Sequence, residues 1–206
     1  MLRVISYIDG FNLYFGLRAK GWKKYYWLDL VSLSSALLKS DQQLEHCHYF
    51  TARIRTGTNQ SQDARRQSLW LDALSSLPEL TIHYGHYLPK PVECKRCGNT
   101  WTTFEEKMTD VNIAAQMLTD AYEDRFDIAL VISADSDLTT PIRLLRERMP
   151  QKRVIVVFPP ERRSAELKKT ANGTVVLGEN KLRQNLLPEN ITTSSGFVLT
   201  RPPQWR

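Results

Sequence analysis

Short runs of apolar residues recur along the chain, and the segments between them carry hydrophobic positions at helical spacing. The apolar runs, interpreted as strands, are residues 4–8, 46–53, 80–84, 128–132 and 153–158. The intervening segments place leucine, isoleucine or valine every three or four residues, which predicts helices. Strands that are mostly apolar and alternate with helices indicate a parallel sheet covered on both faces. The chain is therefore predicted to form a three-layer α/β/α sandwich around a central, mainly parallel sheet.

Two segments depart from this alternation. Residues 89–103 contain prolines, Cys94, Cys97 and Gly98, and are interpreted as a loop inserted into the domain. Residues 188–206 show no core-forming periodicity, so a loosely attached tail is expected there. The predicted organisation is one domain over residues 1–187 followed by that tail.

Composition narrows the class of protein. A chain of 206 residues with 42% hydrophobic content can bury one good core. No apolar run approaches the roughly 20 residues that cross a bilayer, so no membrane association is expected. The start of the chain lacks the features of a signal peptide and leads directly into a strand, and three cysteines do not make a disulfide framework. A cytoplasmic protein is the expectation.

The positive charge is concentrated in the last third of the chain. Residues 143–206 hold 13 of the 28 Lys and Arg residues but only 5 of the 22 Asp and Glu residues. A basic flank beside an acidic site suits a protein that acts on a polyanion, although a solvated basic surface gives the same imbalance.

Aspartates stand where two of the predicted strands end. The strand at 4–8 runs into Asp9, and the strand at 128–132 runs towards Asp135 and Asp137. In parallel sheets, ligands bind beyond the carboxyl ends of the strands. Taken singly, each aspartate is more often a helix cap, but acids at the ends of two strands favour a shared site. Carboxylates that are withdrawn from water need a positive partner, most simply a divalent cation.

A fourth acid, Asp110, follows Thr109, which is expected to cap a helix. Mg²⁺ and Mn²⁺ take oxygen ligands, so four aspartates can hold one or two ions against a phosphodiester. The metal would activate a water and stabilise the charge that develops on the phosphate. Asp135-x-Asp137-x-Thr139 also looks like the nucleophile motif of haloacid-dehalogenase-type phosphatases, and a Toprim-like D-x-D site is another reading. Both fit poorly, because the former motif belongs to the first strand and the latter needs a strand-end glutamate.

Three motifs in order support a family resemblance. They are Y-I-D-G-F-N-L at 7–13, E-E-K-M-T-D-V at 105–111 and S-A-D-S-D-L at 133–138. With them the chain resembles the NYN domain family of PIN-like proteins, and within it the bacterial LabA/DUF88 type, from about Val4 to Leu177. The resemblance implies a PIN-like sandwich and an Mg²⁺- or Mn²⁺-dependent ribonuclease.

The resemblance also implies roles for individual residues. The catalytic and metal-binding acids would be Asp9, Asp110, Asp135 and Asp137. Asn12 would support Asp9 or contact phosphate, Ser133 would contact a metal-bound water or phosphate, and Lys107 completes a K-x-x-D pattern. Each of these three residues also has an interpretation without a functional role. Asn12 can form an Asx turn, Ser133 can be a satisfied hydroxyl at a strand end, and Lys107 can be a solvated side chain.

The pair Cys94 and Cys97 looks like half of a zinc knuckle, a feature that many family members do not have. A structural Zn²⁺ needs four ligands, and His83 and His86 lie just upstream but would point to opposite faces of a strand. A complete zinc site would need a second chain, and hence a homodimer. A degenerate knuckle without metal is the alternative.

The leading hypothesis is a ribonuclease that acts on RNA. Arg53 and Arg55 are expected to hold the RNA backbone, and aromatic residues within 22–27 either stack on bases or, more often in proteins, pack in the core. The alternative is a catalytically weak RNA-binding or partner-binding regulator that retains the metal pocket. A phosphatase of small metabolites is a third reading.

Overall fold

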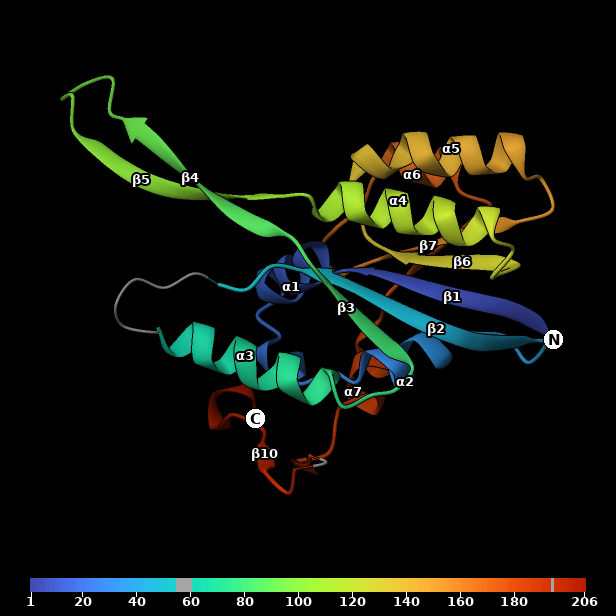
Figure 1. Cartoon of the computed structure of the whole chain (residues 1–206), viewed down its shortest axis with the longest axis horizontal. Helices are drawn as coiled ribbons and strands as arrows, with labels where there is room; N and C mark the ends of the chain where they lie inside the picture. The colour runs from blue at the N-terminus through green and yellow to red at the C-terminus, as the bar shows by residue number, and fades with distance from the viewer. Residues whose placement is uncertain (55–60, 194) are drawn as a thin grey trace.

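The computed structural model describes residues 1–54, 61–193 and 195–206, and of Glu105 and Glu106 only the backbone. Its centre is a six-stranded sheet of order β3-β2-β1-β6-β7-β8 in which all neighbours run parallel (Figure 1). The strands are β1 (Leu2–Asp9), β2 (Gln42–Thr51), β3 (Leu80–Tyr84), β6 (Ile128–Ile132), β7 (Arg153–Phe158) and β8 (Gly173–Val176). The predicted α/β/α sandwich is confirmed.

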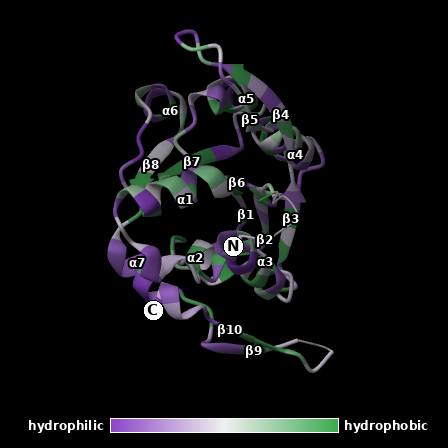
Figure 2. Cartoon of the chain, turned by 90° about the vertical axis from the view of Figure 1, so that its left-hand side faces the viewer, coloured by the Kyte–Doolittle hydropathy of each residue, from purple (hydrophilic) through white to green (hydrophobic). Residues whose placement is uncertain are grey.

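Helices cover both faces of the sheet. One core cluster joins the sheet to α1 (Gly10–Ala19), α2 (Leu30–Ser35), α3 (Gln62–Leu74) and α7 (Glu179–Gln184). The other joins it to α4 (Thr109–Tyr122), α5 (Thr139–Arg148) and α6 (Ala165–Thr170). Successive side chains of a strand point to opposite faces, so Val4 and Ile8 serve the first cluster and Ile5 and Tyr7 the second. In Figure 2 the hydrophobic colour is concentrated on strands such as β7 and the hydrophilic colour on α7.

The predicted strands at 80–84, 128–132 and 153–158 have the observed bounds. The predicted cap of α4 is wrong by one residue, because Met108 and not Thr109 is the N-cap, with a φ of 85°. Asp110 nevertheless lies in the first turn of α4, as expected.

The segment predicted to be a loop is a β-hairpin. Strands β4 (His86–Glu93) and β5 (Thr100–Lys107) pair antiparallel, and Figure 1 shows this hairpin, here called the arm, extending away from the sandwich. The loop interpretation followed from Pro89 and Pro91, which lack the N–H that a ladder uses. In a two-stranded ribbon each strand has an outer edge, where a missing N–H is tolerated.

The tail also differs from expectation. It contains β9 (Asn190–Thr192), β10 (Val198–Thr200) and a 3-10 turn, η3 (Pro203–Trp205). Leu199 and Trp205 are only 4% and 8% exposed and belong to the core cluster that contains Trp27. The Trp27 indole N–H donates to the Pro188 carbonyl at 2.8 Å. Two isolated apolar residues create no periodicity in the sequence, yet they attach this segment to the sandwich. Among the described residues, no helix is long and apolar enough to cross a membrane.

Candidate acidic site at the carboxyl ends of the strands

Asp9 is the buried centre of the candidate site. It ends β1 and caps α1, and it is 1% exposed. Its Oδ1 accepts from the Asn12 backbone N–H at 2.9 Å, and its Oδ2 accepts from Asn12 Nδ2 at 2.6 Å. The Ser133 hydroxyl donates to Oδ2 at 2.8 Å. Asn12 therefore supports Asp9, as the resemblance implies, and the Ser133 hydroxyl is engaged by the same carboxylate.

Gly10 allows this turn from strand to helix to pass close to β2. A Cβ on Gly10 would lie 2.7 Å from the Phe50 carbonyl oxygen and 2.6 Å from the Tyr49 hydroxyl. A side chain at position 10 would collide with β2, so the close approach of the two elements requires a glycine here. No separate turn lies between strand and helix, because α1 begins at Gly10 itself.

The environment of Asp9 is electrostatically unfavourable for a lone carboxylate. Burial raises its pKa, donors from Asn12 and Ser133 partly offset this, and the charge of Asp135 raises the pKa further. Within the described ranges, no Lys, Arg or His forms an ion pair with Asp9, Asp135 or Asp137. The site therefore gathers negative charge without a protein cation against it.

A row of hydrogen bonds links Asp9 to the acids beyond β6. Ser133 is fully buried, and its hydroxyl accepts from the Asp135 backbone N–H at 3.0 Å while it donates to Asp9. Asp135 Oδ1 in turn accepts from the Asp137 N–H at 3.0 Å, at the start of the 3-10 turn η2 (Ser136–Leu138). Asp135 is half-buried and Asp137 is exposed. The two strand ends thus meet in one site, here called the acidic row: Asp9, Ser133, Asp135 and Asp137.

The remaining acid belongs to the same end of the molecule. Asp110 is half-buried in the first turn of α4, and α4 contacts both β1 and η2. Lys107 ends β5, at the base of the arm. Both side chains take part in interactions within the protein.

The carboxylates of the acidic row differ in how many lone pairs they have left to bind a cation. A carboxylate has about four lone-pair sites, and three protein donors already occupy Asp9. Asp135 accepts one hydrogen bond and Asp137 accepts none from the described residues, so these two have the most capacity left. Mg²⁺ usually keeps several waters and binds through one or two carboxylates, and such a donor set fits it. A closed protein cage does not form, since no group of three or more His, Cys, Asp or Glu among the described residues could hold a metal.

Of the two arginines predicted to bind RNA, Arg53 and Arg55, only Arg53 lies within the described residues. Arg53 follows β2; its guanidinium lies 5.0 Å from the centroid of the Tyr84 ring and donates to the Tyr84 hydroxyl at 3.1 Å. Arg53 lies beyond the carboxyl end of β2, at the same end of the parallel sheet as the acidic row. Arg55 lies outside the described residues.

The cysteine pair lies away from the acids, in the turn of the arm. Hydrogen bonds from the backbone N–H groups of Arg96 and Cys97 lower the pKa of Cys94. His83 is engaged elsewhere, at 2.9 Å from His48, and His86 pairs with Lys107 at the opposite end of the arm. Neither histidine therefore lies with the cysteine pair in the turn of the arm.

Asp120 is a fully buried acid on α4 that lies outside the acidic row. It is 0% exposed and accepts from the Tyr7 hydroxyl at 2.8 Å, with His48 Nε2 at 3.3 Å. Burial raises its pKa, but the hydrogen bonds from His48 and Tyr7 outweigh burial and lower it. Its spacing from Ile113 and Met117 on α4 was a signal for burial, since positions i, i+4 and i+7 share one helix face.

An aromatic pocket of about 170 Å³ lies against the start of α1, beside the acidic row. Its lining includes Tyr14, Tyr26, Tyr49, Trp70, Tyr87 and Trp205. The Tyr26 hydroxyl is buried and forms no hydrogen bond with a described residue. Burial, with a smaller effect from Tyr14, raises the pKa of Tyr26 to about 12. Of the aromatic residues at 22–27, Trp27 is a core residue and Tyr26 is a pocket residue.

Fold and site together define the class: an α/β/α sandwich whose acids converge at the carboxyl ends of neighbouring parallel strands. The NYN domain model matches residues 3–178, and the chain belongs to the NYN domain family. NYN domains are typically nucleases that use divalent metals, so the family supports a hydrolase at this coarse level.

Two known proteins are similar to the chain. It is 29% identical over 196 residues to 6-hydroxy-3-succinoylpyridine 3-monooxygenase of Pseudomonas putida, with 77% of this chain covered. The chain spans about 60% of the length of that enzyme. The crystal structure of a protein of unknown function from Vibrio parahaemolyticus has a TM-score of 0.56 at 16% identity. That likeness covers 90% of this chain and 96% of the other, and it shows the shared fold.

Proposed function

We propose that the protein is an endoribonuclease that depends on Mg²⁺ or Mn²⁺. The observation that carries the proposal is the acidic row, in which two strand ends bring carboxylates together and no Lys, Arg or His of the described residues forms an ion pair with Asp9, Asp135 or Asp137. Asp135 and Asp137 would hold the ion, with waters as its other ligands, and Asp9 would add the negative charge of a third carboxylate behind them, linked to Asp135 through Ser133. A bound ion supplies an activated water and stabilises the charge that develops on the phosphodiester.

Protein groups around the row would orient substrate and ligands. Asn12 and Ser133 fix the rotamer of Asp9 through the hydrogen bonds described above, so its free lone pair points in one direction. Arg53 and the basic last third of the chain would hold phosphates, with an affinity that falls as salt rises. Asp110, in the first turn of α4, and Lys107, at the end of β5, would contact metal or substrate at the edge of the site.

The test is cleavage of labelled RNA with Mn²⁺, with and without EDTA, by the parent and by Asp135→Asn. We expect the variant to lose roughly a hundredfold to ten-thousandfold in rate, because a neutral amide binds a divalent cation poorly. Asp41→Asn is the matched control, since Asp41 is exposed and immediately precedes β2, at the opposite end of the sheet. Equal cleavage by Asp135→Asn and the parent would overturn the proposal.

Binding measured in the same samples separates the enzyme from a regulator. If both the parent and Asp135→Asn bind RNA in a salt-sensitive way but neither cleaves it, the protein is an RNA-binding regulator and not a nuclease.

A second candidate function is action on a small heteroaromatic compound, such as the hydroxypyridine in the name of the Pseudomonas relative. The observation that favours it is the aromatic pocket, which Tyr26 lines and where the Tyr26 hydroxyl, without a hydrogen bond to any described residue, would donate to a ring substituent. Gly10, the residue after Asp9, also lines this pocket, so the pocket lies next to the acidic row.

Titration with a hydroxypyridine, followed by the fluorescence of Trp70 and Trp205, tests this candidate. We expect saturable binding that Tyr26→Phe weakens about tenfold, the effect of one lost hydrogen bond. Tyr122→Phe is the control, because Tyr122 is 83% exposed. No binding, or the same affinity in Tyr26→Phe, would remove the candidate.

A further inference from the structure

The arm ends in a tight turn built around Cys94. Its two strands pair without interruption from His86 and Lys107 to Glu93 and Thr100. The Cys94 N–H then donates to the Asn99 carbonyl at 2.8 Å, and the Gly98 N–H donates to the Cys94 carbonyl at 2.8 Å. The turn depends on glycine, because Gly98 has a φ of +67°.

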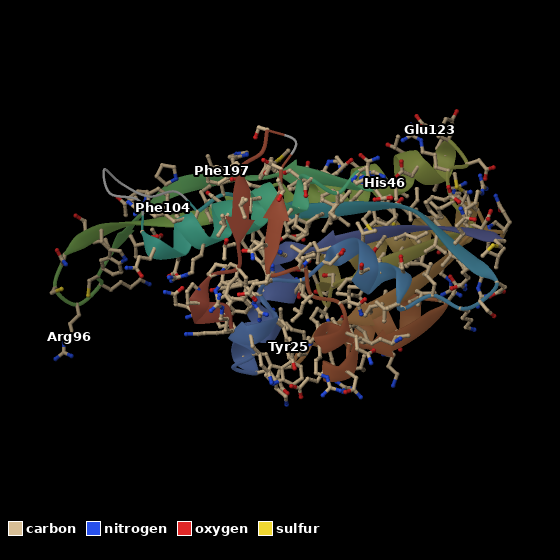
Figure 3. The ribbon with its side chains drawn as sticks, turned by 90° about the horizontal axis from the view of Figure 1, so that it is seen from below. Tyr25, His46, Arg96, Phe104, Glu123 and Phe197 are labelled. Carbon is tan, nitrogen blue, oxygen red and sulfur yellow. The ribbon has the colours of Figure 1, made fainter. Side chains whose placement is uncertain are left out.

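Cys94 and Cys97 are both carried by this turn, which the hydrogen bond from the Gly98 N–H to the Cys94 carbonyl closes. The backbone N–H groups of Arg96 and Cys97, followed by the Cys97 side chain, lower the pKa of Cys94. Backbone N–H groups directed at sulfur favour the thiolate, which is the form that binds metal. Cys97 is exposed, and Figure 3 shows Arg96 at the end of the arm with its side chain pointing away from the sandwich.

One chain supplies only half of a metal site here. Structural Zn²⁺ is tetrahedral and takes four Cys or His ligands. In the part of the chain that the structure describes, no third candidate ligand joins the pair. Cys47 is buried in the core, and burial raises its pKa to about 12, so it is not available.

We propose that the arms of two copies of this chain meet at their tips around one Zn²⁺, with Cys94 and Cys97 of each copy as its four ligands. Binding converts the two thiols of each chain to thiolates and releases their protons to solvent. A twofold axis through the ion makes both halves identical, which is the commonest symmetry of homodimers.

Charge and exposure favour a second copy as the partner. Four thiolates and one Zn²⁺ carry a net charge of −2, and the exposed Lys95 and Arg96 of both chains stand directly beside them. The arm also exposes large apolar side chains, Leu88 and Trp101 at 47% each, on one face of the hairpin by their register. A second arm alongside would cover part of this apolar surface.

The experiment measures zinc content and mass on protein purified under reducing conditions without added metal. We expect half a zinc per chain and a dimer by light scattering. Cys97→Ser should give a monomer with at least a tenfold lower zinc content, and it should fold normally because Cys97 is exposed. Cys47→Ala, which removes the thiol outside the arm, should keep both the zinc and the dimer.

Three results would overturn the proposal. They are one zinc per monomeric chain, a dimer that persists unchanged in Cys97→Ser, and a metal-free monomeric parent.

Discussion

Replacing Asp9 with asparagine is expected to abolish RNA cleavage and, at neutral pH, to make the protein more stable. Loss of a metal-site carboxylate should cost about a thousandfold or more in rate. The same change removes a charge that is 1% exposed and lies near Asp135. The free energy of unfolding at pH 7 should therefore rise.

The pH dependence follows from the raised pKa of Asp9. Above the ordinary carboxyl range the unfolded chain has lost this proton while the folded chain still holds part of it. Asp9 therefore lowers stability as pH rises through that interval, and Asp9→Asn should lack this slope. Urea unfolding of both proteins between pH 4 and pH 8 measures the difference.

Asp29→Asn provides the matched control. Asp29 also caps a helix, accepting from the Ser32 N–H at 2.9 Å, but it is more exposed than Asp9 and stands outside the acidic row. Asparagine caps helices about as well as aspartate, so stability and cleavage should both change little. A less stable Asp9→Asn with an unchanged pH slope would contradict the explanation.

Replacing Asp120 with alanine should have the largest effect on stability, a loss of about 3–5 kcal/mol. The carboxylate is fully buried, and its removal leaves the Tyr7 hydroxyl and His48 without their common acceptor. Gln116 Nε2, which donates to the other carboxylate oxygen at 2.9 Å, would lose its partner as well. Urea unfolding at pH 7 measures the change.

The contribution of Asp120 should also depend on pH. Its pKa is lowered in the folded protein, so its stabilising effect is complete above the ordinary carboxyl pKa and is lost as pH falls through the lowered value. The difference between the parent and Asp120→Ala should therefore shrink below about pH 4. Asp72→Ala, on the exposed side of α3, should stay within about 0.5 kcal/mol of the parent. A loss below 1 kcal/mol for Asp120→Ala would show that the network contributes little.

The candidate site was largely predictable because its parts are local. Asp9 ends one apolar strand and Asp135 follows shortly after another. Parallel strands bring their carboxyl ends to one edge of the sheet, independently of the loops between them. Asn12 is three residues from Asp9, within the reach of a capping contact. The joint placement of these acids needed only the strand periodicity and the order along the chain.

The pocket and the buried network were not predictable in the same way. The aromatic pocket combines α1, β2, α3, the base of the arm and the end of the tail, and no short window of sequence contains more than a part of it. Two partners of Asp120, Tyr7 and His48, are 113 and 72 residues away. Such contacts depend on how helices pack on the sheet.

The sequence by itself determined the parallel sandwich and the acids at its edge, because apolar runs, helical spacing and strand-end carboxylates are local patterns. The tertiary structure decided that the cysteine segment is an arm and that the tail is anchored by Trp205. It also decided that Asp120 is buried and that Tyr26 lines a pocket. These features depend on which distant side chains share a buried space, and that is fixed only when the whole core packs.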